Sequence, residues 1–309
     1  MNDSKKKIVT VIVTYNRIDL LKECIEALSK SKYETDIIVV NNNSSDGTKE
    51  YLDSIGPQYK SIKFYIYNLN ENLNGAGGFN YGIREAAKLP YDYIWIMDDD
   101  CIVNEESLTK LIEAAETLHD DFGFLSSKVL WTDGSICKTN VQRLSVARKI
   151  KDFETRLVKV DYASFVSLLV KKEDVIRLGL PIKDFIIWTD DLEWTRRFTN
   201  RKTNESAKSG FLVNDSIVTH KCKNNFGVTI VKDTSDRIDR YKYIYRNDVY
   251  CFKKEGIRGY IYVVIRNLYH IIKILFLSKT NKFSKIKTII KGFNEGLKFN
   301  PQIEYVEGA

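Results

Sequence analysis

Apolar runs of strand length alternate with amphipathic segments over about the first hundred residues. Residues 8–13 and 36–41 are apolar, largely β-branched runs typical of strands, and residues 19–30 between them repeat Leu and Ile at helical spacing. The same patterns predict one more helix and two more strands, at residues 48–55, 63–68 and 93–97. Because strands alternate with helices, we expect right-handed crossovers and a doubly wound, mainly parallel α/β sheet of the Rossmann-like kind.

The rest of the chain is less regular and ends in a helical, basic region. Residues 162–170 and 211–219 are typical of strands and residues 172–178 of a helix, while residues 188–199 indicate an acidic loop that enters a helix. From about residue 235 the pattern becomes helical and rich in Lys and Arg. The sequence therefore predicts a boundary near residue 232, with an α/β domain at residues 1–232 and a helical basic extension at residues 233–309.

Polar residues or glycines follow four of the predicted strands, at the point where each strand ends. Ligands of doubly wound sheets bind at the carboxyl ends of the strands. Four segments leave those ends and are expected to converge on one polar cleft: residues 14–17, 41–43, 70–78 and 98–100.

Three consecutive carboxylates follow the fourth strand. Side chains alternate along an extended chain, so Asp98 and Asp100 should point the same way and Asp99 the opposite way. Two hard oxygen ligands on one side suit Mg²⁺ or Mn²⁺, which also takes oxygens from a diphosphate. An acidic solvated turn or the start of a helix is the alternative.

A glycine-rich segment precedes a helical stretch at residues 80–88. Its glycines would let the backbone approach a ligand closely, and the helix N-terminus would attract phosphate or sugar oxygens. The spacing is not that of a dinucleotide-binding motif, and a tight loop without a ligand is the alternative. The residues concerned are Asn74, Gly75, Gly77 and Gly78.

Composition and cysteine usage narrow the class of protein without naming a function. The chain has 309 residues, of which 43% are hydrophobic and 29% charged, as in ordinary globular proteins. Its five cysteines are widely spaced and form no C-x-x-C pair, so neither a disulfide framework nor a zinc site is indicated. Residues 1–7 lead straight into a strand without the apolar segment of a signal peptide, so we expect a cytoplasmic protein.

The basic extension carries most of the positive charge. Residues 237–309 hold nine more Lys and Arg than Asp and Glu, so that with a net charge of +7 the rest of the chain carries about −2. Residues 257–277 are long enough to span a bilayer, but they contain Arg258, Arg266 and Lys273, which argue against a spanning helix. On a helix these three basic residues lie within an arc of about 80°, so one side of the helix is basic. We expect an amphipathic helix at an anionic membrane, the alternatives being that it packs on the core or on a second subunit.

Five segments together resemble glycosyltransferase family two, which has the GT-A fold. They are residues 14–17, 41–48, 74–79, 98–100 and 188–193, and they occur in one order over about 180 residues. The sequence Asn-Gly-Ala-Gly-Gly-Phe at 74–79, combined with three Asp, is most similar to the galactofuranosyltransferases. The rhamnosyltransferases of polysaccharide assembly are the next most similar.

The resemblance implies roles for individual residues. Thr14, Tyr15 and Arg17 would line the nucleotide pocket and Asn42 would lie beside the base, where many relatives have an acid. Asp98 and Asp100 would hold Mn²⁺ or Mg²⁺ with His220, and Asp99 would contact the donor. The remaining predicted contacts with the nucleotide sugar come from the glycine-rich segment and from Trp188. Asp191, next to Asp190, would be the general base, although both acids could instead be ordinary first-turn residues of a helix and His220 could be structural.

The function implied is an inverting, metal-dependent transfer of a sugar to a hydroxyl of a lipid-linked or oligosaccharide acceptor. Residues 1–100 would bind the nucleotide sugar and residues 101–232 the acceptor, at the inner face of the cell membrane. The donor would be UDP-galactofuranose, or alternatively dTDP-rhamnose, and the C-terminal helices could join two copies of the chain. A nucleotidyltransferase shares the carboxylates and the metal. A nucleic-acid-binding module would not explain the acids in the cleft, which repel phosphate.

Overall fold

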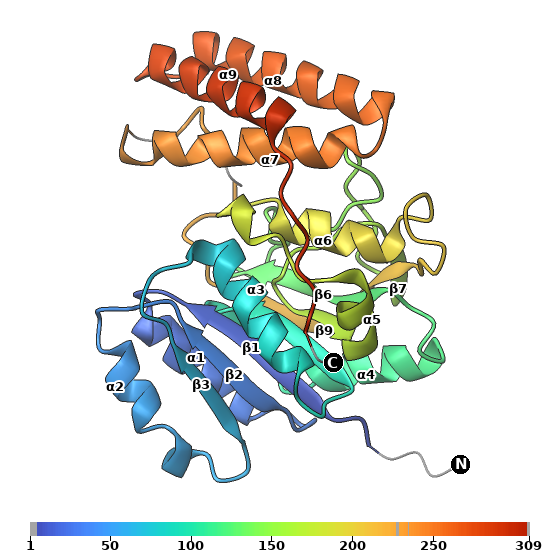
Figure 1. The fold of residues 1–309 in the computed structure, drawn as a ribbon. Coiled ribbons are helices and arrows are strands. Elements are labelled where there is room, and N and C mark those ends of the chain that lie inside the picture. Colours follow the sequence, from blue (N-terminus) through green and yellow to red (C-terminus); the bar gives the residue numbers. More distant parts are fainter. Residues whose placement is uncertain (1–4, 227–228, 234, 308–309) are drawn as a thin grey trace.

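A single nine-stranded sheet forms the centre of the computed structural model, which describes residues 5–226, 229–233 and 235–307 (Figure 1). Residues 1–4 of the N-terminal segment at residues 1–7 lie outside the described residues. The strand order is β3-β2-β1-β4-β8-β6-β9-β5, with β7 paired to β9. The strands are β1 (Ile8–Thr14), β2 (Asp36–Asn41), β3 (Phe64–Asn68), β4 (Tyr93–Asp98), β5 (Cys101–Val103), β6 (Phe124–Trp131), β7 (Leu157–Val160), β8 (Leu168–Lys171) and β9 (Gly210–His220).

The first half of the sheet is parallel and the second half is mixed. Strand β1 pairs in parallel with β2 and β4, and β2 with β3, as the alternation of strands and helices predicts. Strands β5, β7 and β8 pair antiparallel with their neighbours, while β6 and β9 run parallel. The expected doubly wound, mainly parallel α/β fold is therefore confirmed. The strand expected at residues 162–170 is shorter than predicted, because pairing begins only at β8.

Helices cover both faces of the sheet, which explains why its strands are continuous apolar runs. Along β1, Ile12 faces a core shared with α1 and α4, while Val11 faces a core shared with α3 and α6. The helices of this region are α1 (Ile18–Ser29), α2 (Thr48–Asp53), α3 (Asn74–Ala87), α4 (Ser107–Thr117), α5 (Lys172–Leu178) and α6 (Asp190–Thr199).

The glycine-rich segment is not a loop before a helix, as predicted, but the first turns of α3. The glycines let this helix lie close to β1, since a Cβ on Gly78 would be 2.5 Å from Val13 Cγ1 and one on Gly82 would be 2.7 Å from Val11 Cγ1. A Cβ on Gly75, in contrast, would have no atom within 4 Å. Close packing of helix on sheet accounts for Gly78, and only Gly75 leaves backbone open to a ligand.

Three C-terminal helices form a layer on one side of the α/β body (Figure 1). They are α7 (Tyr241–Lys253), α8 (Ile257–Leu277) and α9 (Lys282–Lys298). Two glycines of α9 bring it close to α7, because a Cβ on Gly292 would lie 2.5 Å from Lys242 O. After α9 the chain returns to the body, where Glu304 accepts hydrogen bonds from Arg84 at 2.7 Å and Lys183 at 2.6 Å. The predicted helical basic extension is confirmed.

The orientation of α8 differs from the prediction. The guanidinium of Arg266 does not face solvent but pairs with Asp248 of α7, and Tyr245 forms a hydrogen bond of 2.9 Å with His270. Polar partners on α7 therefore draw part of the basic stripe inward. Apolar side chains are left on the outside instead, and we call Ile261, Ile265, Leu268, Ile272, Leu275 and Phe276 the apolar face of α8. By length and composition this helix could cross a membrane.

Candidate active site

Two carboxylates and one imidazole meet at the carboxyl end of β4. Strand β4 ends at Asp98, and His220 ends β9, where it lies opposite Cys101 of β5. The backbone N–H of Lys221 also donates to Asp100 O at 2.9 Å. One ligand atom from each of Asp98, Asp100 and His220 lies within 4.8 Å of the others. The structure thus brings together the three residues predicted to bind metal.

The chemistry of this cluster fits a divalent cation. Asp100 Oδ1 is buried and accepts no hydrogen bond from any residue that the structure describes, although His220 Nε2 lies 3.0 Å away. An unpartnered buried carboxylate oxygen is costly, and a cation would satisfy it. Burial, with the charge of Asp100, raises the pKa of Asp98 to about 6. Two oxygens and an imidazole nitrogen are suitable ligands for Mn²⁺ and Mg²⁺.

Asp99 points toward the exit of β1, opposite to its two neighbours, as the alternation predicts. The Thr14 hydroxyl donates to Asp99 Oδ2 at 2.7 Å. Arg17 Nη1 donates to Asp99 Oδ1 at 3.2 Å and to Asp100 Oδ2 at 2.9 Å. Burial raises the pKa of Asp99 to about 7, against the charge of Arg17. Asp99 therefore connects the two strand exits and orients Arg17, whose side chain remains half exposed.

The residues predicted to bind the nucleotide fall into two groups. Tyr15 is exposed beside Arg17, so both are accessible to a ligand. Asn42 is only 2% exposed, and its amide accepts from the Leu73 N–H at 2.8 Å and donates to Asn74 O at 3.0 Å. These two bonds show that Asn42 fixes the start of α3, and its contact with the base stays a prediction.

The second acidic pair begins α6, and its charges interact with that of Asp98. Asp190 is buried, and burial, followed by the charge of Asp191, raises its pKa well above the usual range. Burial also raises the pKa of Asp191 to about 6, while its Oδ1 accepts a 2.7 Å hydrogen bond from the Leu192 N–H. The charges of Asp191 and Asp98 interact, which places the two acidic motifs in one electrostatic environment.

A strained segment leads into this acidic pair. Ile186, Trp188 and Thr189 have φ of 68°, 64° and 71°, values that residues other than glycine rarely adopt. The Trp188 ring packs on Tyr241 of α7, with ring centroids 5.3 Å apart. Strain of this kind persists only where the surrounding structure holds it.

Asn247 of α7 holds the strained segment, a role that the sequence analysis did not assign to this residue. Its side-chain amide, which is fully buried, donates to the backbone oxygens of Phe185 at 3.0 Å, Ile187 at 3.2 Å and Trp188 at 2.9 Å. The next residue, Asp248, accepts a 3.2 Å bond from the Thr189 hydroxyl. A helix of the basic extension therefore supports the predicted general base. The sequence signal for Asn247 is its place at the end of a tyrosine-rich segment, residues 241–247.

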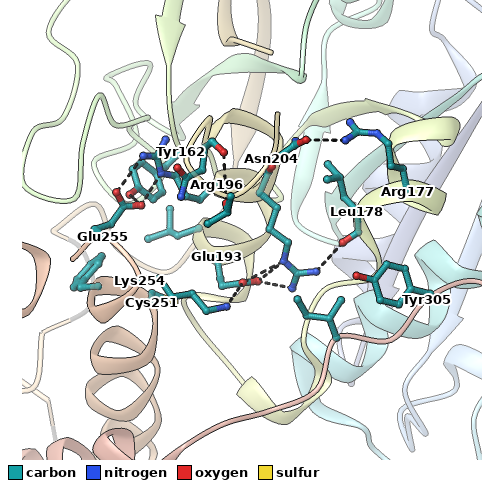
Figure 2. Close-up of a pocket in the computed structure, with 16 residues that line it drawn as sticks. Tyr162, Arg177, Leu178, Glu193, Arg196, Asn204, Cys251, Lys254, Glu255 and Tyr305 are labelled. Carbon is teal, nitrogen blue, oxygen red and sulfur yellow. Dashed lines mark hydrogen bonds and ion pairs between the residues drawn. The ribbon is translucent and has the colours of Figure 1, made fainter. Parts of the chain in front are cut away.

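A separate cavity of about 510 Å³ lies along α6 (Figure 2). It is lined by ion pairs, among them Arg196 to Glu255 at 2.6 Å and Arg197 to Glu193 at 2.9 Å. None of the predicted site residues lines it. Because its charged groups are already paired, we attribute this cavity to the junction between α6 and the turn after α7.

Comparison with known proteins shows a similarity to one enzyme family over the first part of the chain. Residues 9–136 match the family model of glycosyl transferase family 2. The poly-beta-1,6-N-acetyl-D-glucosamine synthase of Staphylococcus aureus (strain MSSA476) is 29% identical over 195 residues, which are 62% of this chain and 45% of that protein. The undecaprenyl-phosphate mannosyltransferase of Micrococcus luteus is 31% identical over 113 residues, which are 36% of this chain and 45% of the relative. The chain thus spans less than half the length of these relatives.

Solved structures share the fold at low sequence identity. The mannosyltransferase PcManGT from Pyrobaculum calidifontis, in complex with GDP-Man and Mn²⁺, has a TM-score of 0.57 and 14% identity, covering 96% of this chain and 77% of that one. S. aureus TarS 1-349 in complex with UDP has a TM-score of 0.51 and 14% identity, covering 95% and 72%. These likenesses identify the fold as GT-A.

Proposed function

We propose that this chain, whose residues 9–136 match the family model of glycosyl transferase family 2 and whose fold is GT-A, transfers a sugar from a nucleotide-sugar donor to an acceptor hydroxyl. The observation that carries the proposal is the convergence of Asp98, Asp100 and His220, with Asp191 near enough for its charge to interact with that of Asp98. Related folds have been solved with UDP, and with GDP-Man and Mn²⁺, which supports a nucleotide diphosphate donor and a divalent cation here.

Residues at the different strand exits would contact different parts of the nucleotide-sugar donor. Asp98, Asp100 and His220 would hold Mn²⁺ or Mg²⁺, which when bound supplies positive charge opposite the leaving nucleoside diphosphate. Arg17, oriented by Asp99, has its guanidinium at the cleft and would add a donor toward the same phosphates. Tyr15 and the open backbone at Gly75 would border the nucleoside and the sugar.

Asp191 would act as the general base. Its pKa of about 6 leaves it ionised at neutral pH while keeping a stronger proton affinity than an ordinary Asp. Buried Asp190 beside it would stay protonated more readily and leave Asp191 as the acceptor of the proton. A base and a leaving group on opposite faces of the sugar require inversion at the anomeric carbon, so a product that retains the donor configuration contradicts this assignment.

For the donor we propose UDP-galactofuranose, with dTDP-rhamnose as the alternative. The choice rests on the Asn-Gly-Ala-Gly-Gly-Phe segment, the three Asp and the presence of His220 in the metal cluster. The test is turnover of a panel of UDP- and dTDP-sugars with Mn²⁺ on a lipid-linked acceptor. Release of UDP with sugar transfer supports the proposal. Release of pyrophosphate from a nucleoside triphosphate would instead indicate a nucleotidyltransferase.

The outer layer of helices would contact an anionic membrane from the cytoplasmic side. The apolar face of α8 is exposed, with Ile265 at 60% and Phe276 at 81%, and Phe283 of α9 is 84% exposed. The same two helices and the turn between them carry exposed lysines, namely Lys279, Lys282, Lys287 and Lys291, and the half-buried Lys273. Apolar groups flanked by cations suit the interface of anionic lipid. We retain residues 1–232 and 233–309 as the catalytic and membrane-contacting parts, although α7 also supports the acidic pair.

Sedimentation with vesicles tests this surface. The full chain should sediment with vesicles that contain anionic lipid and less with neutral vesicles. The double variant Ile265→Glu, Ile272→Glu should lose sedimentation. As a control, Lys49→Gln with Lys60→Gln removes the same two units of charge from exposed positions at and after α2 and should keep it. A double variant that still sediments, or that converts a dimer in solution to a monomer, would show that the face serves another purpose.

A further inference from the structure

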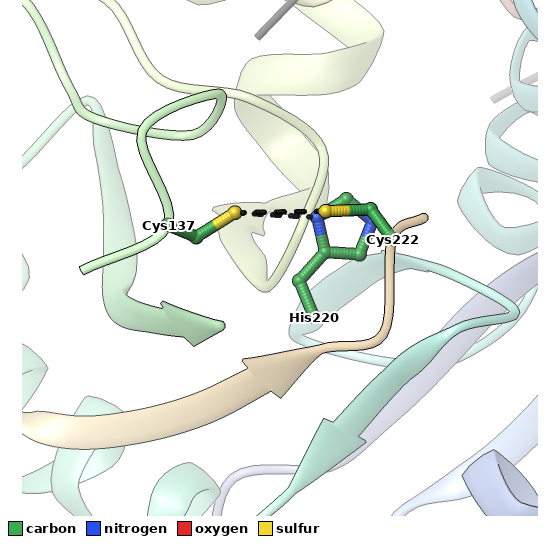
Figure 3. Close-up of side chains that lie close together, drawn as sticks. All are labelled: Cys137, His220 and Cys222. Carbon is green, nitrogen blue, oxygen red and sulfur yellow. Dashed lines mark hydrogen bonds between the residues drawn. The ribbon is translucent and has the colours of Figure 1, made fainter. Parts of the chain in front are cut away.

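Two cysteines lie beside His220, on the side opposite to the carboxylates. Cys137 Sγ is 3.9 Å from Cys222 Sγ and 3.8 Å from His220 Nδ1, and the three ligand atoms all lie within 4.8 Å of one another (Figure 3). Both cysteines are free thiols. They are 85 residues apart, and the sequence spacing therefore gave no sign of the cluster.

The fold fixes both cysteines from well-formed elements. Cys137 follows β6, and its N–H donates to Val129 O at 2.9 Å. Cys222 follows β9, and its carbonyl accepts a 2.9 Å bond from the Trp131 indole. Asn140 Oδ1 lies 2.8 Å from His220 Nδ1 and accepts a 3.1 Å hydrogen bond from the Cys137 thiol, so one side chain holds both groups in place.

The distances match a metal site better than a disulfide. A tetrahedral Zn²⁺ with Zn–S of about 2.3 Å and Zn–N of about 2.0 Å has ligand separations of about 3.8 Å between sulfurs and about 3.5 Å between sulfur and nitrogen. The observed separations of 3.9 and 3.8 Å agree to a few tenths of an ångström. A disulfide requires about 2.0 Å between the sulfurs, which would need a movement of about 1.9 Å.

We propose that Cys137, Cys222 and His220 Nδ1 form a second site, which binds a thiophilic divalent cation such as Zn²⁺ and competes with the carboxylate site for His220. A neutral imidazole has one lone pair. When Nδ1 binds a metal the ring proton sits on Nε2, 3.0 Å from Asp100, and the carboxylate site loses its nitrogen ligand. The two cations therefore weaken each other's binding reciprocally. The competition rests on the proposed function, whereas the thiol site does not.

Cobalt tests the thiol site directly. Co²⁺ alone, added to the reduced full-length protein, should produce one equivalent of thiolate-to-cobalt charge-transfer absorbance, and Zn²⁺ should abolish it. Cys137→Ser and Cys222→Ser should each lose most of this absorbance. Cys251→Ser, in α7, and Asp98→Asn should keep it. Melting curves of the metal-free variants identify any that fail to fold, and the part-exposed Cys222 is the milder of the two substitutions. Wild-type protein without the absorbance, or an unchanged band in both cysteine variants, overturns the site.

Manganese binding tests the competition. The electron paramagnetic signal of free Mn²⁺ gives its affinity, which one equivalent of Zn²⁺ should weaken about tenfold in the wild type and leave unchanged in the Cys137→Ser, Cys222→Ser double variant. An equal affinity with and without Zn²⁺ overturns the competition. If Mn²⁺ fails to bind even without Zn²⁺, the carboxylate site of the proposed function falls with the competition, while cobalt absorbance would still establish the thiol site.

Discussion

Replacing Asn247 by Leu should cost more activity than stability. The substitution preserves side-chain size but removes the amide that donates to the oxygens of Phe185, Ile187 and Trp188. This amide is fully buried, so water cannot take its place. The strained backbone that it holds leads directly into Asp190 and Asp191.

The expected magnitudes follow from these contacts. Each buried backbone oxygen that loses its partner lowers the free energy of unfolding by about 1–3 kcal/mol. The segment can offset part of this loss by relaxing its left-handed residues, since each costs about 1–3 kcal/mol to hold in that conformation. We therefore expect a net loss of about 2 kcal/mol in the free energy of unfolding. Relaxation would also displace Asp191, and a misplacement of about 1 Å in a catalytic group can reduce turnover about 100-fold.

The assay compares turnover with donor binding and chemical denaturation. The kcat of Asn247→Leu should fall about 100-fold while the dissociation constant of UDP changes little, because the metal cluster belongs to other strands. The matched control is Asn267→Leu on α8, where the buried amide has no hydrogen-bond partner among the described residues, so stability should be equal or higher and kcat unchanged. Wild-type kcat in Asn247→Leu would refute the positioning role of α7.

Three further predictions concern the cleft. Asp191→Asn should keep UDP binding but lose about 100-fold or more in turnover. In the wild type, kcat/KM should fall as the pH drops below about 6, because the base becomes protonated, and a flat profile between pH 5 and 7 would contradict this. Asp98→Asn should abolish Mn²⁺-dependent turnover yet raise the melting temperature of the metal-free protein, since a carboxylate with a raised pKa destabilises the fold when it is ionised. A lower melting temperature would count against the repulsion between Asp98 and Asp100. Gly78→Ala should destabilise by about 1–3 kcal/mol through the contact with Val13, whereas Gly75→Ala should be neutral or stabilising, as denaturant titration of both variants would show.

Local sequence patterns predicted the fold and the polar segments at the ends of its strands. Strand β2 and helices α5 and α8 occupy the residues that the patterns predicted, because burial on both faces imposes continuous apolar runs and packing on one side imposes helical spacing. Strands that end in parallel place their exits together, and so Asp98 and Thr14 could be assigned to one cleft before any coordinates were known.

Other features depended on contacts between distant segments. The inward turn of Arg266 depends on Asp248 of a neighbouring helix, and the buried setting of Asn42 depends on the start of α3. The helical start of the glycine-rich segment likewise depends on how closely α3 approaches β1.

By itself the sequence determined the class of fold, the polar edge of the sheet and the identity of the acids there, because each of these depends on residues that are close together in the sequence. Only the tertiary structure decided that Asn247 supports the acidic loop and that Cys137 and Cys222 share His220, since these groups come from segments that meet only after the chain folds. Side-chain partners separated by tens of residues leave no periodic signal, and packing alone selects them.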